Sequence, residues 1–547
     1  MAPTGSFDAV VVGSGAGGGA VAYALTRAGF RVCVLEKGPH YTEADFFHDE
    51  LLVCRRNFFV PSPLEEPHMI LKPGDRAAQR SADTWIACCV GGGTVHMSGF
   101  FFRLHREDLR LRSLYGEVAG ASVADWPLSF DQLEPFYDQV ERVIGVSGDA
   151  AQNPAEPHKT PYPLAPILSH PAAALVEQGA RKLGLHAFPT PRALLSADYA
   201  GRSACQYCGF CGSYGCEVGA KSSSLATFLA LAARTGKLTL QPRAMVTAVG
   251  ADRRGRARSV TYLDAQGALH EVRGRVIVLC CSAVETARLL LQSRLANASG
   301  QVGQNLLFAS FASGWGRFPI PSPHWPPGAG GLPFLDRSIQ DFYLLPQAGL
   351  PHPKAGTLLF MLPHVNPIFQ LERLAHTPAG QPPLWGPTLK RRMREFFHDT
   401  RTIEWEAFGE FLPHPGCDVT LDPEVKDRFG LPVARIRLAV HPATGAASDF
   451  LAQKGRSVLE AAGAGALGSS SEEPIYTVLQ AGTARMGSDP ARSVTDPTGQ
   501  AHQVKNLYVA DGSGFPSAGG APFTLTIMAN ALRVGAHIVA RGKMGQL

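Results

Sequence analysis

Three glycines between a short apolar run and a stretch of small residues constrain this chain more than any other feature. Residues 8–12 form an apolar run typical of a buried parallel strand, and Gly13, Gly15 and Gly18 follow it. Gly13 permits a tight turn, Gly15 lets the backbone approach a pyrophosphate, and Gly18 lets helix and strand pack closely. The N-terminus of the helix that follows then offers free N–H groups to an anion. The sequence therefore predicts a dinucleotide-binding βαβ unit.

An acidic residue at the expected distance supports this interpretation. Glu36 lies 23 residues after Gly13, at the end of a second apolar run over residues 31–35. A carboxylate at that point can accept hydrogen bonds from a ribose diol. This pattern alone does not separate NAD from FAD, so both dinucleotides remain open at this stage.

Length and charge exclude several classes of protein. A chain of 547 residues suggests three or four domains, and its 45% apolar and 18% charged residues favour a large buried core over disorder. The net charge of +5 is small, and there is no long run of Lys or Arg. Nucleic-acid binding through a basic surface is therefore not expected.

The chain also lacks the marks of a membrane or secreted protein. No apolar stretch approaches the length of a transmembrane helix, and the N-terminus runs into the first strand without a signal segment. The eleven cysteines are scattered unevenly, which argues against a secreted disulfide framework. We expect a reducing compartment, with the cytoplasm as the location.

Pieces of the nucleotide-binding layer recur far along the chain. Apolar runs at 275–280 and 506–510 predict further strands, and leucine spacing predicts helices over 283–292 and 525–538. The nucleotide-binding domain is therefore expected to be discontinuous. The proline-rich segment 319–387 predicts irregular loop structure.

Four cysteines fall within twelve residues, in the pattern Cys205-x2-Cys208-x2-Cys211-x4-Cys216. Four thiolates this close on one loop can wrap an iron–sulfur cluster, which needs several converging soft ligands. Zinc sites usually split their ligands into two separated pairs, so zinc is the less favoured metal. Glu217 follows the last cysteine in place of the Pro of bacterial ferredoxins, so this is no simple ferredoxin motif.

Sequence blocks spread along the chain carry a resemblance to a known family. The first and last read VVVGSGAGGGAVAYALTRAGFRVCVLEKG and AGTARMGSDPARSVTDPTGQAHQVKNLYVADGSGFPSAGGAPFTLTIMANALR. Between them lie VGGGTVHMSGFFFRLHREDL, DWPLSFDQLEPFYDQVERVIGVSG, VIVLCCSAVETARLLLQS and FGEFLPHPGCDVTLDPEVKDRFGLP. Over nearly its whole length the chain resembles the glucose–methanol–choline (GMC) family of FAD oxidoreductases.

The resemblance implies an α/β fold with a Rossmann-like FAD-binding lobe and an α+β substrate lobe built on an antiparallel sheet. The FAD-binding lobe is expected to comprise residues 1–110, 201–300 and 500–547, the second of these including the cysteine-rich segment. The substrate lobe is expected to comprise residues 111–200 and 301–499.

Matching the family's motifs residue by residue implies a set of FAD contacts. The positions that match the ADP-binding motif are Gly13, Gly15, Gly18 and Glu36. The loop that follows the isoalloxazine and ribityl is matched by Gly91, Gly92, Gly93 and Thr94. Val246 matches a backbone contact to the adenine, and Asp511 and Gly512 match the segment at the pyrophosphate and ribityl chain. His96 stands where some relatives link a histidine covalently to the flavin, and the resemblance leaves open whether this chain does so.

The cysteine run narrows the resemblance further. Membrane-associated GMC dehydrogenases of gluconate, fructose, glucose and glucosides carry a cysteine-rich segment before a GAK-type sequence, here Gly219-Ala220-Lys221. In them it holds a three-iron cluster that passes electrons from FAD to a haem subunit. The resemblance thus implies a three-iron or four-iron cluster, a haem electron acceptor and a small chaperone-like subunit as partners. The periplasm is an alternative location, because a partner subunit can carry the signal.

Two positions depart from the family pattern. GMC enzymes usually abstract the hydroxyl proton of an alcohol with a histidine three residues before the GT of a GTxRMG block, assisted by a second His or Asn. Here these positions are Leu479 and Pro522, neither of which can accept a proton. The catalytic residues therefore remain unassigned.

Three readings of this departure stay open. In the first, another ionisable group, or Gln480 with water, accepts the proton in alcohol oxidation. In the second, the substrate is apolar and undergoes carbon–carbon dehydrogenation, reduction or isomerisation. In the third, the subunit has lost catalysis and is an electron-transfer or scaffold protein. The leading expectation is an FAD-dependent dehydrogenase of alcohols or sugars that passes electrons from its flavin to an iron–sulfur cluster. Its partners include a small-molecule substrate.

Overall fold

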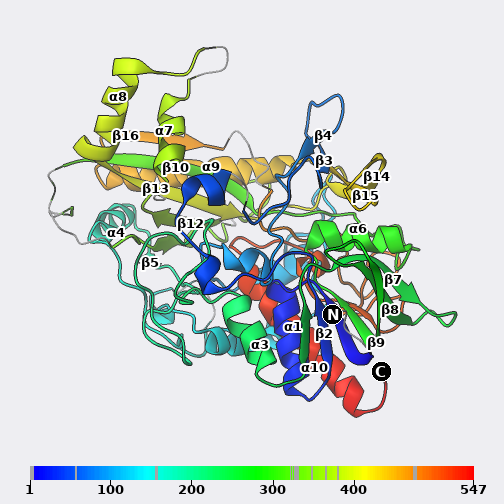
Figure 1. The fold of residues 1–547 in the computed structure, drawn as a ribbon. Helices are drawn as coiled ribbons and strands as arrows, with labels where there is room; N and C mark the ends of the chain where they lie inside the picture. The colour runs from blue at the N-terminus through cyan, green and yellow to red at the C-terminus, as the bar shows by residue number, and fades with distance from the viewer. Residues whose placement is uncertain are drawn as a thin grey trace.

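Three β-sheets organise the chain in the computed structural model (Figure 1). The structure describes residues 5–55, 58–153, 155, 158–320, 322, 324–325, 332–345, 349–363, 366–377, 381–471 and 477–547. The seven-stranded sheet has the order β6-β2-β1-β9-β8-β7, with β17 also paired to β9. The six-stranded sheet has the order β16-β10-β13-β12-β11-β5, and the four-stranded sheet has the order β14-β15-β3-β4.

The seven-stranded sheet combines a parallel layer with an antiparallel meander. Its parallel strands are β1 (Ser6–Val12), β2 (Val32–Leu35), β6 (Leu238–Gln241), β17 (Leu507–Val509) and the second half of β9 (Leu269–Leu279). The antiparallel neighbours of β9 are β8 (Ala257–Leu263) and, beyond it, β7 (Met245–Ala251). Strands from both ends and the middle of the chain thus share one sheet, as the discontinuous apolar runs predict.

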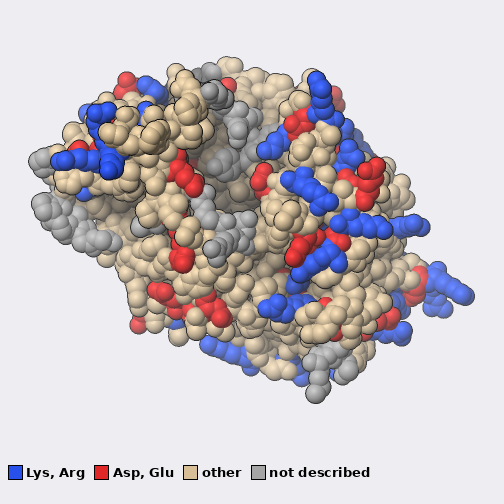
Figure 2. All heavy atoms as spheres, turned by 45° about the horizontal axis from the view of Figure 1, so that its top comes forward, with Lys and Arg blue, Asp and Glu red and all other residues tan. Residues whose placement is uncertain are grey.

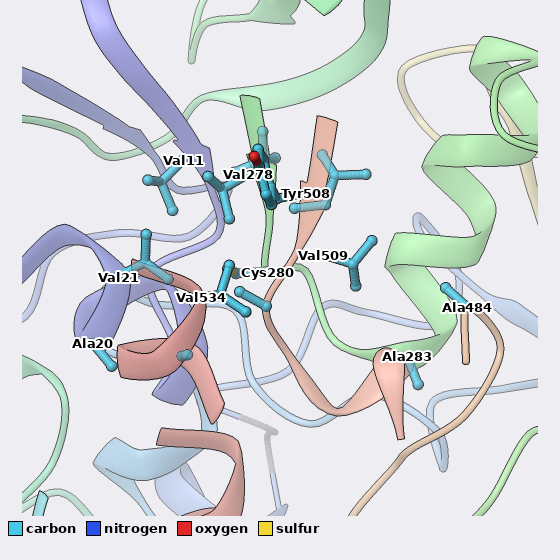
Figure 3. Packing of buried hydrophobic residues seen from close by; sticks show 14 of the residues in the cluster. Val11, Ala20, Val21, Val278, Cys280, Ala283, Ala484, Tyr508, Val509 and Val534 are labelled. Carbon is cyan, nitrogen blue, oxygen red and sulfur yellow. The ribbon is translucent and has the colours of Figure 1, made fainter. Parts of the chain in front are cut away.

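Two helices from opposite ends of the chain pack together against this sheet. α1 (Ala16–Arg27) lies beside α10 (Thr524–Lys543), and α3 (Phe130–Ile144) packs on α10. Figure 3 shows the apolar side chains between them, including Val21 and Val534 beside Val11 and Val278. Burial of such side chains stabilises the fold by about 25 cal/mol per Å² of apolar surface.

The six-stranded sheet is antiparallel and carries helices on one face. Its strands are β5 (Ala187–Pro189), β10 (Ser310–Pro319), β11 (Arg337–Ile339), β12 (Gly356–Met361), β13 (Thr400–Gly409) and β16 (Ala466–Ser470). The helices α4 (Ala173–Lys182) and α9 (Pro442–Ala461) cover the face that presents Trp405, which is fully buried.

The remaining elements connect these layers. The four-stranded sheet consists of β3 (His68–Leu71), β4 (Gln79–Ser81), β14 (Asp418–Lys426) and β15 (Pro432–Arg437). The other α-helices are α2 (Leu111–Tyr115), α5 (Ala230–Ala233), α6 (Ala283–Ser293), α7 (Pro367–Ala375) and α8 (Gly386–Arg394). The short helical turns are Glu43–Asp45, Leu51–Arg55, Gly92–Val95, Arg106–Arg110, Ala150–Gln152, Leu225–Leu229, Glu395–Asp399 and Gly512–Gly514.

The mixed α/β architecture with an antiparallel second sheet confirms the predicted fold class. The prediction of irregular structure over residues 319–387 was wrong in part, since β11, β12 and α7 lie there. The described prolines of this segment lie at the end of β10, between the elements, or at the start of α7 and α8, where a missing N–H is tolerated. Among the described helices, none is long and apolar enough to cross a membrane. On the face drawn in Figure 2, Lys and Arg side chains alternate with acidic ones.

Candidate cofactor site and active site

A cavity of about 250 Å³ opens at the carboxyl ends of the parallel strands. In open α/β sheets this edge is the usual place for a bound ligand. Nine of the twelve predicted cofactor residues line it, namely Gly13, Gly15, Glu36, Gly92, Gly93, Thr94, Val246, Asp511 and Gly512. Gly18, Gly91 and His96 do not line this cavity.

Gly13, Gly15 and Gly18 are glycines for different physical reasons. Gly13 has a positive φ of 90°, and a Cβ there would overlap the carbonyl oxygen of Cys280. A Cβ on Gly18 would overlap the carbonyl oxygen of Gly13, so Gly18 serves packing rather than contact with a ligand. A Cβ on Gly15 would meet no protein atom closer than the Cα of Gly92, at 3.8 Å. The protein itself thus leaves room for a side chain at Gly15, and this open space at the N-terminus of α1 fits a dinucleotide phosphate.

Glu36 is held at the end of β2 by hydrogen bonds to both of its oxygens. The Ser14 N–H and hydroxyl donate to Oε2 at 3.0 and 2.7 Å, and the Gly38 N–H donates to Oε1 at 2.9 Å. Burial raises the pKa of Glu36, while donation from Gly38 and Ser14 opposes this rise. The carboxyl is fixed at the cavity wall, where it can still accept a hydrogen bond from a ribose.

The loop over residues 91–94 is fastened to the same serine. The Gly91 N–H donates to Ser14 Oγ at 3.0 Å, and Thr94 Oγ1 donates to the Gly91 carbonyl at 2.6 Å. Thr94 Oγ1 in turn accepts from the Ser224 N–H at 2.8 Å. Sequence reasoning missed Ser14, although its place inside the glycine fingerprint was the available signal.

The carboxyl of Asp511 is held by hydrogen bonds from neighbouring protein groups and is not free in the cavity. Its carboxyl accepts from the Ser282 N–H at 3.0 Å, from the Thr286 hydroxyl at 2.7 Å and from the Ser513 N–H at 2.9 Å. Burial raises the pKa of Asp511, and these hydrogen bonds oppose the rise. Ser282 has φ 76° and ψ 164°, a conformation that glycine adopts readily and serine rarely.

His96 lies behind the cavity wall. Its Nε2 donates to the Ile86 carbonyl at 2.9 Å, and its ring stacks on Phe59 with the ring centres 5.2 Å apart. Burial lowers the pKa of His96 to about 4, so the ring is neutral at physiological pH. The neighbouring Thr94 and Met97 line the cavity in its place.

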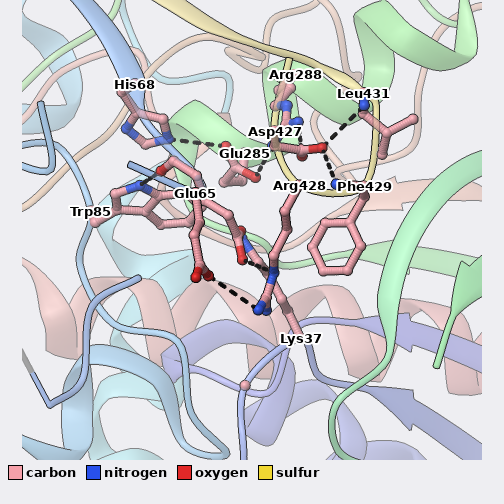
Figure 4. A network of polar contacts seen from close by, with 12 residues as sticks. Lys37, Glu65, His68, Trp85, Glu285, Arg288, Asp427, Arg428, Phe429 and Leu431 are labelled. Atoms are coloured by element: carbon pink, nitrogen blue, oxygen red, sulfur yellow. Dashed lines mark hydrogen bonds and ion pairs between the residues drawn. The ribbon is translucent and has the colours of Figure 1, made fainter. Parts of the chain in front are cut away.

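Charged residues that sequence reasoning missed surround the end of the cavity near Glu36. Lys37, Glu285 and Arg288 all line it, and Figure 4 shows them in one network. Lys37 forms an ion pair with Glu66 and lies 4.1 Å from the ring centre of Trp85. The position of Lys37, directly after Glu36, could have indicated that it lies at the cavity. Glu285 and Arg288 come from a distant segment, and nothing in the sequence indicated them.

The same network ties α6 to the four-stranded sheet. Arg288 pairs with Glu285 at 3.2 Å and with Asp427 at 2.5 Å, and His68 Nε2 lies 3.2 Å from Glu285. Burial alone would raise the pKa of Glu285, but Arg288 and His68 hold it well below its usual range. Truncating one partner would leave a buried charge without its counter-charge, which is strongly destabilising. The network therefore holds this part of the cavity wall in place.

Leu479 and Gln480 also line the cavity. Leu479 has a positive φ of 56°, a conformation that costs an L-residue about 1–2 kcal/mol. Its side chain lines the cavity and packs against an aromatic cluster of the second lobe. Pro522 is buried and lies outside the cavity lining, whereas Thr524 and Ile527 contribute to it. Neither position supplies a proton acceptor.

Gln480 brings a hydrogen-bonding side chain to the cavity lining next to Leu479. Its Nε2 donates to the Thr84 carbonyl, which fixes the orientation of the amide. Its Oε1 is buried and makes no hydrogen bond with any described residue. An unpaired buried acceptor is unfavourable, which fits a bound group that donates to it.

The four cysteines of the run line a second, smaller cavity of about 20 Å³. All eleven cysteines, which lie within the described ranges, are free thiols. Burial raises the pKa of Cys205 to about 12 and also raises the pKa of Cys208 and Cys211. Among the described residues, no three His, Cys, Asp or Glu side chains are placed so that they could hold a metal ion. The thiols therefore share a cavity without forming a finished ligand set.

A buried lysine holds the cysteine loop in shape. Lys221 is 2% exposed, and its Nζ donates to the carbonyls of Cys211 at 2.6 Å, Tyr214 at 2.7 Å and Val95 at 3.2 Å. Two backbone N–H groups point at sulfur: that of Tyr207 at Cys205, 3.4 Å away, and that of Lys221 at Cys216, 3.5 Å away.

The two cavities lie on either side of one short segment. Gly92, Gly93, Thr94 and Met97 line the larger cavity. In the same segment, the carbonyl of Val95 accepts from Lys221, and that of His96 accepts from the Ser213 N–H at 2.8 Å. Residues 92–97 therefore join the larger cavity to the cysteine loop.

Replacing Gly15 tests whether the larger cavity binds the dinucleotide. We expect Gly15→Val to fold and to lose FAD by about tenfold or more in flavin-to-protein ratio, because the new side chain fills the phosphate position. Gly445→Val is the matched control, since a Cβ there meets nothing within 4 Å and lies away from the cavity lining. A Gly15→Val protein with the full flavin content would contradict this assignment.

The position of His96 gives a second expectation. Because its Nε2 is bound to the Ile86 carbonyl and its ring lies outside the cavity lining, we expect no covalent link to FAD. Acid precipitation should release all the flavin into the supernatant, measured by absorbance. Flavin that stays with the pellet and is lost from it in His96→Ala would overturn this expectation.

Comparison with known proteins agrees with this geometry. Two sequence profiles described as GMC oxidoreductase match residues 7–309 and 413–531. Paromamine 6′-oxidase of Streptomyces fradiae is 31% identical, with 96% of this chain and 90% of the relative covered. 2-Methyl-1,2-propanediol dehydrogenase of Mycolicibacterium austroafricanum is 30% identical, covering 98% and 95%. The gluconate 2-dehydrogenase flavoprotein of Pantoea cypripedii is 28% identical, covering 93% and 89%.

Solved structures share the fold at low sequence identity. A variant of Aspergillus oryzae formate oxidase superposes with a TM-score of 0.62 at 15% identity, covering both chains fully. Pyridoxine 4-oxidase from Mesorbium loti gives a TM-score of 0.61 at 18% identity, covering 97% of this chain and 98% of that one. With family profiles over more than half of its length, the chain belongs to the GMC oxidoreductase family and is an FAD-dependent oxidoreductase.

Proposed function

We propose that this protein is a dehydrogenase that oxidises a CH–OH donor and passes the electrons to an iron–sulfur cluster held by its cysteine loop. The observation that carries the proposal is the segment 92–97, which borders the FAD cavity on one side and contacts the cysteine loop on the other. The names of the relatives support the donor class, since one is a diol dehydrogenase and another a gluconate dehydrogenase flavoprotein.

Bound FAD supplies an acceptor for a hydride from the substrate carbon. The residues of this chain would hold the cofactor by its phosphates at Gly15 and the N-terminus of α1, and by its ribose at Glu36. Leu479 and Gln480 line the same cavity, and we propose that the reacting part of the cofactor meets the substrate beside them. Leu479 would exclude water there, and Gln480 Oε1, which has no partner among the described residues, would accept a hydrogen bond from the substrate.

The proton of the alcohol needs an acceptor other than the usual one. Leu479 and Pro522 leave no basic side chain at the family positions. Gln480 can orient a hydroxyl or a water but is too weak a base to remove a proton. We propose that the proton leaves through a water held at Gln480, or through another ionisable group of the substrate lobe.

The iron–sulfur proposal depends on the cysteine loop. Cys205, Cys208, Cys211 and Cys216 already line one cavity, and N–H groups point at two of the sulfurs. Such donors stabilise thiolate sulfur in metal sites. The loop would rearrange so that three or four thiolates meet on one cluster. Dioxygen would then be a poor electron acceptor, and a haem subunit and a small chaperone-like subunit are the proposed partners.

Two alternatives follow from the apolar surroundings of Leu479. The enzyme would carry out carbon–carbon dehydrogenation, reduction or isomerisation on an apolar substrate, or it would be a silent electron-transfer or scaffold subunit. Both are weaker, because Gln480 keeps an unpaired acceptor in the cavity, which suits a substrate with an O–H donor. For location we propose the cytoplasm, with the periplasm as the alternative if a partner carries the signal.

Metal analysis tests the cluster directly. Protein purified without oxygen should contain about three or four irons per chain and absorb visible light beyond the flavin bands. Cys208→Ala should lower the iron content, whereas Cys33→Ala should not, because Cys33 is buried in β2 away from the loop. Iron-free protein with flavin bands alone would refute the cluster.

Anaerobic mixing tests the reaction. We expect an alcohol or a sugar to bleach the flavin absorbance, and Leu479→His to accelerate this by roughly 10²-fold, the lower value typical of a placed general base. Bleaching by an apolar alkene, with none by alcohols or sugars, would favour carbon–carbon dehydrogenation. No bleaching by any of these compounds would favour the scaffold alternative.

A further inference from the structure

A further cavity lies between the six-stranded sheet and the helices α7 and α8, which stand beside the end of this sheet in Figure 1. Its volume of about 360 Å³ falls within the range of small-molecule binding sites. The lining comes from the end of β10, the start of β13, the two helices and the turn that follows α8. None of these residues also lines the FAD cavity, so the two cavities have separate walls.

Three arginines line this cavity, and two of them have acidic partners. Arg317 Nη1 lies 3.0 Å from Glu395, and Arg373 Nη1 lies 2.6 Å from Glu404. Arg392 of α8 forms no ion pair with a described residue, and its Nη1 donates to a backbone carbonyl at the end of α7 at 3.3 Å. One guanidinium charge at the cavity is therefore uncompensated. The other N–H groups of Arg392 are available to an anion.

The sheet contributes buried polar atoms that lack partners. Thr402 of β13 is 6% exposed, and its Oγ1 makes no hydrogen bond with a described residue. Arg317 lies directly opposite Thr402 on β10, and its Nε is buried and equally unpaired within the described part of the chain. Unpaired buried polar groups are unfavourable and rare in native structures. Because a hydroxyl and a guanidinium N–H both donate, a single acceptor of negative charge satisfies both.

The rest of the lining favours an organic anion over a small inorganic ion. Trp315, Leu374 and Phe396 give the cavity apolar walls. An inorganic anion would leave most of the 360 Å³ to water, beside side chains that gain from contact with an apolar group. The single uncompensated charge matches a carboxylate, which carries one negative charge, better than a doubly charged phosphate.

We propose that this cavity binds a small organic carboxylate that is not the substrate oxidised at the flavin. The carboxylate accepts hydrogen bonds from Arg392, Arg317 and Thr402, and its apolar body lies against Trp315 and Phe396. Because α7, α8 and the sheet share the cavity, the bound carboxylate holds the two helices against the sheet. The inference depends neither on the proposed alcohol oxidation nor on the cysteine loop.

Calorimetric titration of the FAD-loaded protein with phenylacetate tests the site. Phenylacetamide is the matched ligand, because it has the same shape without the charge. We expect phenylacetate to bind once per chain and at least about tenfold more tightly than the amide, since the amide cannot replace the charge-assisted bond to Arg392. The flavin absorbance spectrum should not change on binding, because no residue lines both cavities.

Two arginines next to each other on α8 provide a variant and its control. Arg392→Gln should weaken the binding of phenylacetate by about tenfold or more. Arg391→Gln removes the same charge from an exposed position that does not line the cavity. It should leave the affinity within about twofold of wild type, because solvent and salt screen a charge that makes no contact.

Thr402→Val removes the unpaired hydroxyl and keeps the shape of the side chain. We expect it to bind phenylacetate at least about threefold more weakly. Without ligand it should unfold at the same temperature as wild type or a higher one, because a methyl group replaces a buried hydroxyl that has no partner. Added phenylacetate should slow amide hydrogen exchange over residues 386–399 in wild type and leave the exchange of α6 unchanged.

The contrary results are equally definite. The proposal is wrong if phenylacetate does not bind, if phenylacetamide binds as tightly, or if Arg392→Gln or Thr402→Val keeps the wild-type affinity. Inorganic phosphate that displaces phenylacetate and binds more tightly would also overturn it, because the site would then select phosphate. A change in the flavin spectrum that persists in Arg392→Gln would place the ligand in the FAD cavity and contradict a separate site.

Discussion

The structure depends on the close approach of backbones at the N-terminus of α1. Gly13 and Gly17 lie against the carbonyls of Cys280 and Ala510, where a Cβ on either glycine would overlap a carbonyl oxygen. At this crossing, segments from both ends and the middle of the chain meet. Because no side chain intervenes, the strands that precede Glu36 and Asp511 end at one cavity, and the N-terminus of α1 points into it.

The FAD cavity is lined by both charged and apolar groups. Lys37, Glu285 and Arg288 belong to a charged network that anchors α6 and the four-stranded sheet. Leu479, whose backbone has a positive φ, lines the same cavity and packs against the aromatic cluster on the six-stranded sheet. The lining thus combines fixed charges with apolar surface, beside which electrostatic interactions are stronger than in water.

Much of this could be predicted from sequence because it rests on local geometry. The turn at Gly13 and the acid at Glu36 are set by spacing within one βαβ unit. The four cysteines of the run are close in sequence, and they line one cavity in the structure. Glu285 and Arg288 could not be predicted as site residues. Their partners His68 and Asp427 come from distant segments and reach them only when the chain folds. The strands within 319–387 were missed because prolines there separate elements rather than exclude them.

The central claim is that one cavity places the reacting end of FAD against Leu479 and Gln480, with the cysteine loop behind residues 92–97. A crystal structure of the flavin-loaded protein tests it most directly. We predict the pyrophosphate at Gly15 and the N-terminus of α1, and the flavin ring in contact with Leu479. A flavin ring bound away from Leu479, or a pyrophosphate bound away from Gly15, would contradict the account.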